Sequence, residues 1–83
     1  MVSTTSENIA RQAESIYEQR LKDALERSHR DEFVAIEPVS GDFFLARTLS
    51  EAIGSARRAH PDRIAHAIRV GHRTAVHFGV SLR

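Results

Sequence analysis

The sequence predicts a single α+β domain with a long N-terminal helix, a β-hairpin, a second helix and a third strand. Three observations predict this order. Apolar residues recur every three or four positions in the first third of the chain, two short apolar runs flank a glycine-containing turn, and a second helical stripe precedes an alternating stretch. We expect α-β-β-α-β topology, with the helices packed on a three-stranded sheet, or a four-stranded one if the tail adds a strand.

The first helix is predicted over residues 7–27. Residues 4–7 (Thr-Thr-Ser-Glu) have the spacing of a capping box, and charged residues fill the face opposite the apolar stripe. A helix of this length is roughly 31 Å long, at 1.5 Å per residue, which is long for so small a domain.

A β-hairpin is predicted next, with strands over residues 33–36 and 43–46. The turn between them contains Pro38 and the Ser40-Gly41-Asp42 segment. Because proline has no amide proton, Pro38 is expected at a strand end or on an edge strand.

The second helix is predicted to end near Ala59, since Pro61 disfavours helical backbone at His60. It is expected to begin after Thr48, whose Thr-x-x-Glu spacing forms a second capping box with Glu51. Residues 64–70 alternate as a strand, which a crossover through the second helix would bring onto the sheet. The tail over residues 71–83 fits either a fourth strand or, as we slightly favour, one helical turn.

The predicted core consists of the large apolar side chains that face inward in this arrangement. They are Ile9, Ile16, Tyr17, Leu21, Leu25, Val34, Ile36, Phe44, Leu49, Ile53, Ile64, Ile68 and Val70.

One domain is expected over residues 1–83, with a flexible lead-in at 1–6 and a flexible tail at 79–83, since 83 residues cannot build a second core. Cysteine is absent, which excludes disulfides and thiolate chemistry and favours a reducing cytoplasm. No basic-then-apolar signal pattern and no apolar run of about 20 residues is present. We therefore expect a cytoplasmic protein.

Charge is distributed unevenly along the chain, although the net charge is only +1. Residues 57–83 contain six arginines and a single acidic residue, Asp62. Arginine pairs with the carboxylates of an acidic protein and with the phosphates of a nucleic acid. The candidate residues for binding a partner or a nucleic acid are Arg57, Arg58, Arg63, Arg69, His72 and Arg73.

Catalytic and metal sites are weighed against ordinary structural roles. His66, His72 and His77 are candidate metal ligands, but their spacings of six and five residues match no common metal motif. Glu37 and Asp42 flank the hairpin turn and form a candidate carboxylate pair, which a solvated turn explains equally well. The serines occupy predicted caps and turns. We expect no catalytic residue, no metal and no cofactor.

Three segments carry a resemblance to a known family. Residues 32–37 (EFVAIE), 40–43 (SGDF) and 68–75 (IRVGHRTA), after the IYE of residues 16–18, resemble the pattern F-V-A-I-(D/E)…S-G-(D/E)-(Y/F)…R-(V/I)-G-(Y/H)…A. That pattern is typical of a family of short, uncharacterised bacterial and cyanobacterial hypothetical proteins, and the resemblance covers about residues 14–79. It implies no activity.

A looser similarity exists to small antitoxin-type α+β domains. Residues 33–56 resemble their run of strand, glycine turn, strand and Thr-Leu-x-Glu-Ala helix. The resemblance implies binding to another protein, although the long first helix departs from that group. We therefore expect a non-enzymatic accessory or regulatory protein that binds a protein partner, with a homodimer through the first helix as one form. The alternative is a nucleic-acid-binding module that uses the basic C-terminal third.

Overall fold

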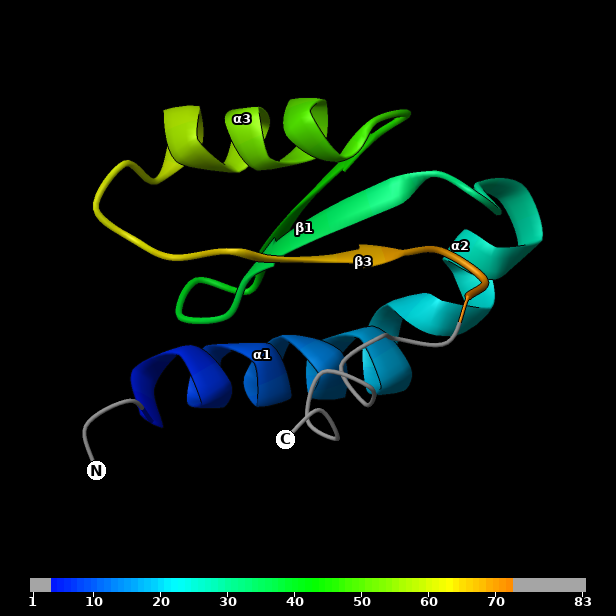
Figure 1. Cartoon of the computed structure of the whole chain (residues 1–83). Helices are drawn as coiled ribbons and strands as arrows, with labels where there is room; N and C mark the ends of the chain where they lie inside the picture. Colours follow the sequence, from blue (N-terminus) through cyan, green and yellow to red (C-terminus); the bar gives the residue numbers. More distant parts are fainter. Residues whose placement is uncertain (1–3, 73–83) are drawn as a thin grey trace, which may run out of the picture.

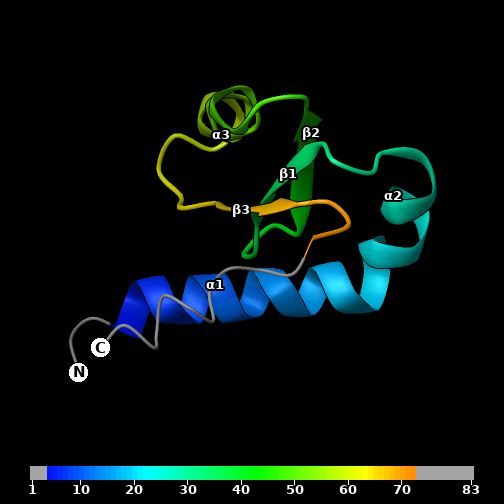
Figure 2. The ribbon, with the colours of Figure 1, turned by 45° about the vertical axis from the view of Figure 1, so that its right-hand side comes forward.

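A computed structural model describes residues 4–72 of the chain (Figure 1). Its N-terminal helical segment comprises α1 (Thr4–Ile16), the π-helical turn η1 (Tyr17–Leu21) and α2 (Lys22–Ser28). The helix therefore begins three residues before the predicted start, and the side chains of the predicted first capping box are only partly described. The π-helical turn was not predicted, and α2 turns away from the axis of α1 after it (Figure 2).

The sheet is three-stranded and confirms the predicted α-β-β-α-β order. Strand β1 (Phe33–Glu37) lies in the centre and pairs antiparallel with both β2 (Asp42–Ala46) and β3 (His66–Arg69). Strands β2 and β3 are consequently parallel to each other, and α3 (Leu49–Ala59) forms the crossover between them. In the register, Ile36 lies opposite Phe43 on one side and His66 on the other.

The two faces of the sheet are covered by different helices. Figures 1 and 2 show α1 below the sheet and α3 above it. Because strand side chains alternate between faces, Val34 and Ile36 pack against α1 and α2 in one core cluster. Ala35 packs with Ala52 and Ala56 of α3 in the other cluster. The fold is thus a helix–sheet–helix sandwich around one strand.

The predicted core is confirmed at seven positions and wrong at two. Tyr17, Leu21, Leu25, Val34, Ile36, Ile68 and Val70 are buried, whereas Ile9, Ile16, Phe44 and Ile53 are half-buried. Leu49 and Ile64 are 50% and 53% exposed, because Leu49 is the first residue of α3, where the sheet does not cover the helix, and β3 starts only at His66. On the α3 face the fully buried positions are taken instead by the small side chains of Ala35, Ala52 and Ala56.

The second helix follows its predicted boundaries. Thr48 caps it, and its Oγ1 accepts a hydrogen bond from the Glu51 amide at 3.2 Å. The helix ends at Ala59, and Pro38 follows the end of β1, as predicted. The open question of a fourth strand or helical turn in the tail, and the predicted flexible tail, lie outside the described residues.

In residues 4–72, no helix is long and apolar enough to span a bilayer.

The central strand offers a direct test of the packing between the sheet and the N-terminal helical segment. We expect Ile36→Ala to lower the free energy of unfolding by about 2–5 kcal/mol, because its fully buried side chain would leave a cavity. Phe43→Ala is the matched control, since Phe43 lies opposite Ile36 on the same face but is 42% exposed. Its expected cost is about 1 kcal/mol or less. Urea denaturation measures both changes in the free energy of unfolding. Equal changes for the two variants would contradict the assignment of Ile36 to the core.

Candidate functional site

The basic candidate residues do not form one surface. Arg57 and Arg58 occupy the last turn of α3, and Arg63 follows in the next loop. Arg69 and His72 lie at the other end of β3, roughly 20 Å of extended chain from Arg63 (Figure 1). Arg73 lies outside the described residues. The site predicted from charge alone is therefore divided between two ends of the sheet.

We call the first of these the turn end, comprising the hairpin turn at residues 38–41 and the loop at residues 60–65. A buried carboxylate organises it. Glu37, the last residue of β1, is only 1% exposed and accepts hydrogen bonds from the amides of Val39 at 2.8 Å and Ser40 at 2.9 Å. Arg63 Nη1 lies 3.5 Å from Glu37 Oε1 and connects the loop to the turn.

Glu37 is held in its charged form. Burial alone would raise the pKa of Glu37, but hydrogen bonds from Ser40 and the Val39 amide, with the positive charge of Arg63, hold that pKa below its ordinary value of 4.5. The predicted explanation of a solvated turn is thus wrong for Glu37, since the strand carries its carboxylate into the interior.

A second connection between turn and loop runs through His60. Its Nε2 lies 2.8 Å from Asp42 Oδ2 and 3.4 Å from Ser40 Oγ, and its ring meets Phe44 edge-on. Serine and aspartate approach the same ring nitrogen, so the histidine cannot relay a proton from one to the other as a catalytic triad does. Asp42 and Glu37 are opposite in register but have separate partners. This cluster is suited to holding two loops together.

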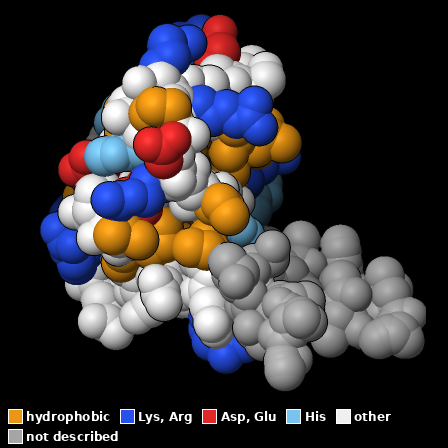
Figure 3. All heavy atoms as spheres, turned by 90° about the vertical axis from the view of Figure 1, so that its left-hand side faces the viewer, with side chains coloured by type: hydrophobic (Ala, Val, Ile, Leu, Met, Phe, Trp, Pro, Cys, Tyr) orange, Lys and Arg blue, Asp and Glu red, His pale blue; other side chains and the backbone are white. Residues whose placement is uncertain are grey.

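The turn end also exposes apolar side chains. Val39 in the turn is 66% exposed, and Ile64 in the loop is exposed as well. Figure 3, which views the molecule from this side, shows hydrophobic side chains interspersed with basic and acidic ones. Beside Ile64 lies a cleft of about 140 Å³ between α3 and the loop. Its lining residues are Ile53, Ala56, Arg57, Arg63, Ile64 and Ala65.

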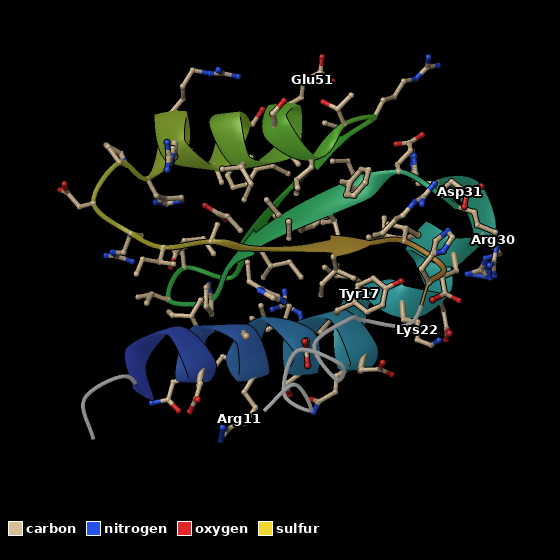
Figure 4. The ribbon with its side chains drawn as sticks, viewed as in Figure 1. Arg11, Tyr17, Lys22, Arg30, Asp31 and Glu51 are labelled. Atoms are coloured by element: carbon tan, nitrogen blue, oxygen red, sulfur yellow. The ribbon has the colours of Figure 1, made fainter. Side chains whose placement is uncertain are left out.

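We call the opposite end of the sheet the bulge end, comprising residues 17–31 and residues 69–72. There the π-helical turn places Tyr17 under β3 (Figure 4). Its hydroxyl donates to Glu26 Oε2 at 2.9 Å and accepts from the Gly71 amide at 3.4 Å. Lys22 and Arg30 also approach the Glu26 carboxylate, at 3.2 and 3.6 Å. The hydrogen bond from Tyr17 lowers the pKa of Glu26, with further lowering from Lys22 and Arg30 against partial burial.

Gly71 and Asp31 shape the backbone at the bulge end. Gly71 has φ +86°, and a Cβ there would come within 2.8 Å of the Arg30 side chain, so glycine is strongly favoured. Asp31 adopts φ 77°, which is uncommon for a residue other than glycine. Its carboxylate lies 2.6 Å from His72 Nε2, and this hydrogen bond lowers the pKa of Asp31.

Arg69 is engaged at the same end. Its Nε donates to the Asp31 carbonyl at 3.4 Å, and its guanidinium lies 5.7 Å from the centre of the Phe33 ring. A groove of about 690 Å³ runs between the helical segment and residues 71–72, lined by charges of both signs together with Tyr17. The mixture of charges gives the groove no preference for an anion.

The histidines predicted as candidate metal ligands do not lie together. His66 faces α1, with its Nε2 3.5 Å from Glu14 Oε2, whereas His72 pairs with Asp31 beyond the end of β3. His77 lies outside the described residues. Over residues 4–72, no three histidine, aspartate or glutamate side chains gather closely enough to hold a metal ion.

Comparison with protein-family models, curated proteins and solved structures gave no match to this chain. The resemblances noted in the sequence stay predictions.

Sequence reasoning missed Glu37 as an organising group and Val39 and Ile64 as exposed groups. One signal was present, since a valine between a proline and a serine in a tight turn has no core to reach. Ile64 gave no such signal, because it continues the alternation of β3 and its exposure depends on where pairing begins.

Glu37 makes stability dependent on pH. We expect Glu37→Gln to lower the free energy of unfolding by about 1–3 kcal/mol at pH 7. Glutamine has one acceptor oxygen and no charge, so it cannot replace the carboxylate that accepts from both the Val39 and the Ser40 amides. A lowered folded-state pKa means that this stabilisation is present above about pH 4.5 and is lost as the pH falls through the folded value.

The measurement is urea denaturation from pH 7 to pH 3, in which the difference between wild type and Glu37→Gln should shrink in acid. Glu51→Gln is the control, because Glu51 lies on the outer face of α3 (Figure 4) and should cost about 1 kcal/mol or less. A difference between wild type and Glu37→Gln that stays constant with pH would contradict the role given to the charge.

Tyr17 is the only tyrosine and tryptophan is absent, so its ionisation can be followed by ultraviolet absorbance. Burial, followed by the hydrogen bond to Glu26, raises the pKa of Tyr17 from 10.0 to about 12. We expect the phenolate to appear near the higher value in the folded protein. Stability should fall as the pH rises from about 10 toward 12, since the unfolded chain ionises first.

The control for Tyr17 compares two glutamates near the ring. Glu26→Gln should move the titration midpoint toward 10 more than Glu18→Gln does, because Glu26 accepts the hydroxyl proton and Glu18 acts only through its charge. A midpoint near 10 in the native wild-type protein, with folding checked by circular dichroism, would refute the buried hydrogen bond.

Proposed function

We propose that this chain is a non-enzymatic accessory or regulatory protein that works by binding another protein through its turn end. The observation that carries the proposal is the pair of exposed branched side chains, Val39 and Ile64, on two loops that are bonded to each other. Contiguous exposed apolar patches rimmed by polar groups are typical of protein-binding surfaces, and we propose that Val39 and Ile64 belong to one.

Contacts within the chain hold the two loops of the turn end together. Glu37 fixes the turn through two backbone amides, Arg63 approaches the same carboxylate, and His60 lies against Asp42 and Ser40. A surface whose loops are already fixed loses less conformational entropy on binding, so more of the contact energy appears as affinity.

The first helix offers less to a partner. In the N-terminal helical segment, the apolar side chains of Tyr17, Leu21 and Leu25 pack against the sheet. The outward side of α1 includes Arg11, which points away from the domain in Figure 4. A homodimer through the outward face of α1 would therefore bury mainly polar groups. We place the binding surface at the turn end and treat self-association as an outcome to be measured.

The nucleic-acid alternative has weaker support. Its basic residues within residues 4–72 lie at two ends of the sheet, and two of them, Arg69 and His72, are already engaged by a backbone carbonyl and by Asp31. Phosphate binding of the simple electrostatic kind favours a continuous positive surface.

The proposal is tested by affinity capture from an extract of the source organism, after nuclease treatment, with three baits compared. Wild type and Leu49→Ser should recover the same stoichiometric protein, and Val39→Ser/Ile64→Ser should lose it. Leu49 is the matched control because it is as exposed as Ile64 but lies at the start of α3, about 15 Å along the helix from the end that leads into the turn-end loop.

Two results would count against the proposal. Recovery that disappears with nuclease would favour the nucleic-acid alternative, and equal recovery by all three baits would show that the turn end is not the binding surface. Sedimentation of the purified protein would show whether the partner at this surface is a second copy.

A further inference from the structure

We propose that the cleft beside Ile64 takes one aliphatic side chain from an acidic peptide segment, whose carboxylates pair with Arg57 and Arg63. This inference rests on the proposed function and names the chemistry of the partner. The cleft lies between α3 and the loop that leads into β3, and its lining combines four apolar side chains with two arginines.

The size of the cleft limits what enters it. Its volume of about 140 Å³ is close to that of an apolar cavity of about 150 Å³ that is known to hold a benzene molecule. One leucine, isoleucine or valine side chain therefore fits, and a tryptophan does not. Ile53, Ala56 and Ala65 supply apolar contacts without a hydrogen-bonding group in their side chains, so a polar side chain would lose its hydration there.

The rim sets the charge of the partner. Arg57 is exposed in the last turn of α3, and no ion pair of Arg57 is present in the described part of the chain. Arg63 contacts Glu37 through one Nη1 atom, whereas a guanidinium carries five N–H donors. Both side chains can therefore pair with carboxylates of a bound segment.

Two features act against an anion here. The carbonyl end of α3 carries partial negative charge, and exposed Asp62 lies next to Arg63. Because both arginines extend their charge away from the backbone on long side chains, the carboxylates should meet the guanidinium groups rather than the helix end. The aliphatic anchor explains why a peptide is favoured over a phosphate backbone, which has no comparable group.

The probe is a short fluorescein-labelled peptide with one leucine flanked by glutamates. We expect binding to the full chain with a Kd on the order of 100 µM or tighter, measured by fluorescence anisotropy. Replacing the leucine by serine should weaken binding about tenfold or more, since the buried aliphatic contact is lost. A peptide with glutamines in place of the glutamates should also bind more weakly.

The protein variants are matched in charge. Arg57→Glu should weaken binding about tenfold or more, whereas Arg58→Glu should change it less than about threefold, because Arg58 does not line the cleft. Both place a glutamate in the same last turn of α3, so their effects on helix stability should be alike, and thermal melts check this. Amide chemical shifts should move at residues 53–57 and 63–65.

Absence of binding up to millimolar peptide, equal effects of Arg57→Glu and Arg58→Glu, or equal affinity of the glutamine peptide would overturn the inference. A negative peptide result together with capture that still depends on Val39 and Ile64 would reject only this cleft and leave the proposed function standing. Failure of both experiments would reject the proposed function as well.

Discussion

Burial of β1 on both faces is the constraint on which the rest of the structure depends. The strand lies between β2 and β3, so its backbone groups are paired on both sides, and its side chains enter two cores. Val34 and Ile36 require α1 and α2 beneath the sheet, whereas Ala35 allows α3 to approach closely above it. Every described element touches this strand or packs on one that does.

The same strand delivers a charge to the interior at its end. Glu37 continues the alternation toward the α3 side but finds the turn amides and Arg63 there instead of apolar groups. An ionised carboxylate is costly to bury unless it is hydrogen-bonded, so the turn must keep one conformation. The exposed side chain of Val39 is thereby presented on a fixed loop, which links core packing to the proposed binding surface.

At the bulge end, the π-helical turn positions Tyr17 to contact residues far from it in the sequence. The Lys22 amide donates to the Tyr17 carbonyl in the π-helical turn, and the tyrosine hydroxyl then joins Glu26 of α2 to Gly71 after β3. No proline or glycine lies in residues 17–21, so the local sequence does not predict the π-helical turn. We interpret the π-helical geometry as the consequence of placing Tyr17 and Leu21 in the core while α2 folds back toward the loop before β1.

The sequence by itself determined the order of elements, the hairpin, the boundaries of α3 and most of the larger core, because periodicity, caps and turn residues act over a few positions. Only the tertiary structure decided that the helices take opposite faces, that Leu49 and Ile64 stay outside, and that Glu37 goes inside. It also divided the basic residues between two ends and assembled the cleft from α3 and a later loop. These features depend on where strand pairing starts and on which segments meet across the sheet, and neither is encoded in any short stretch of residues.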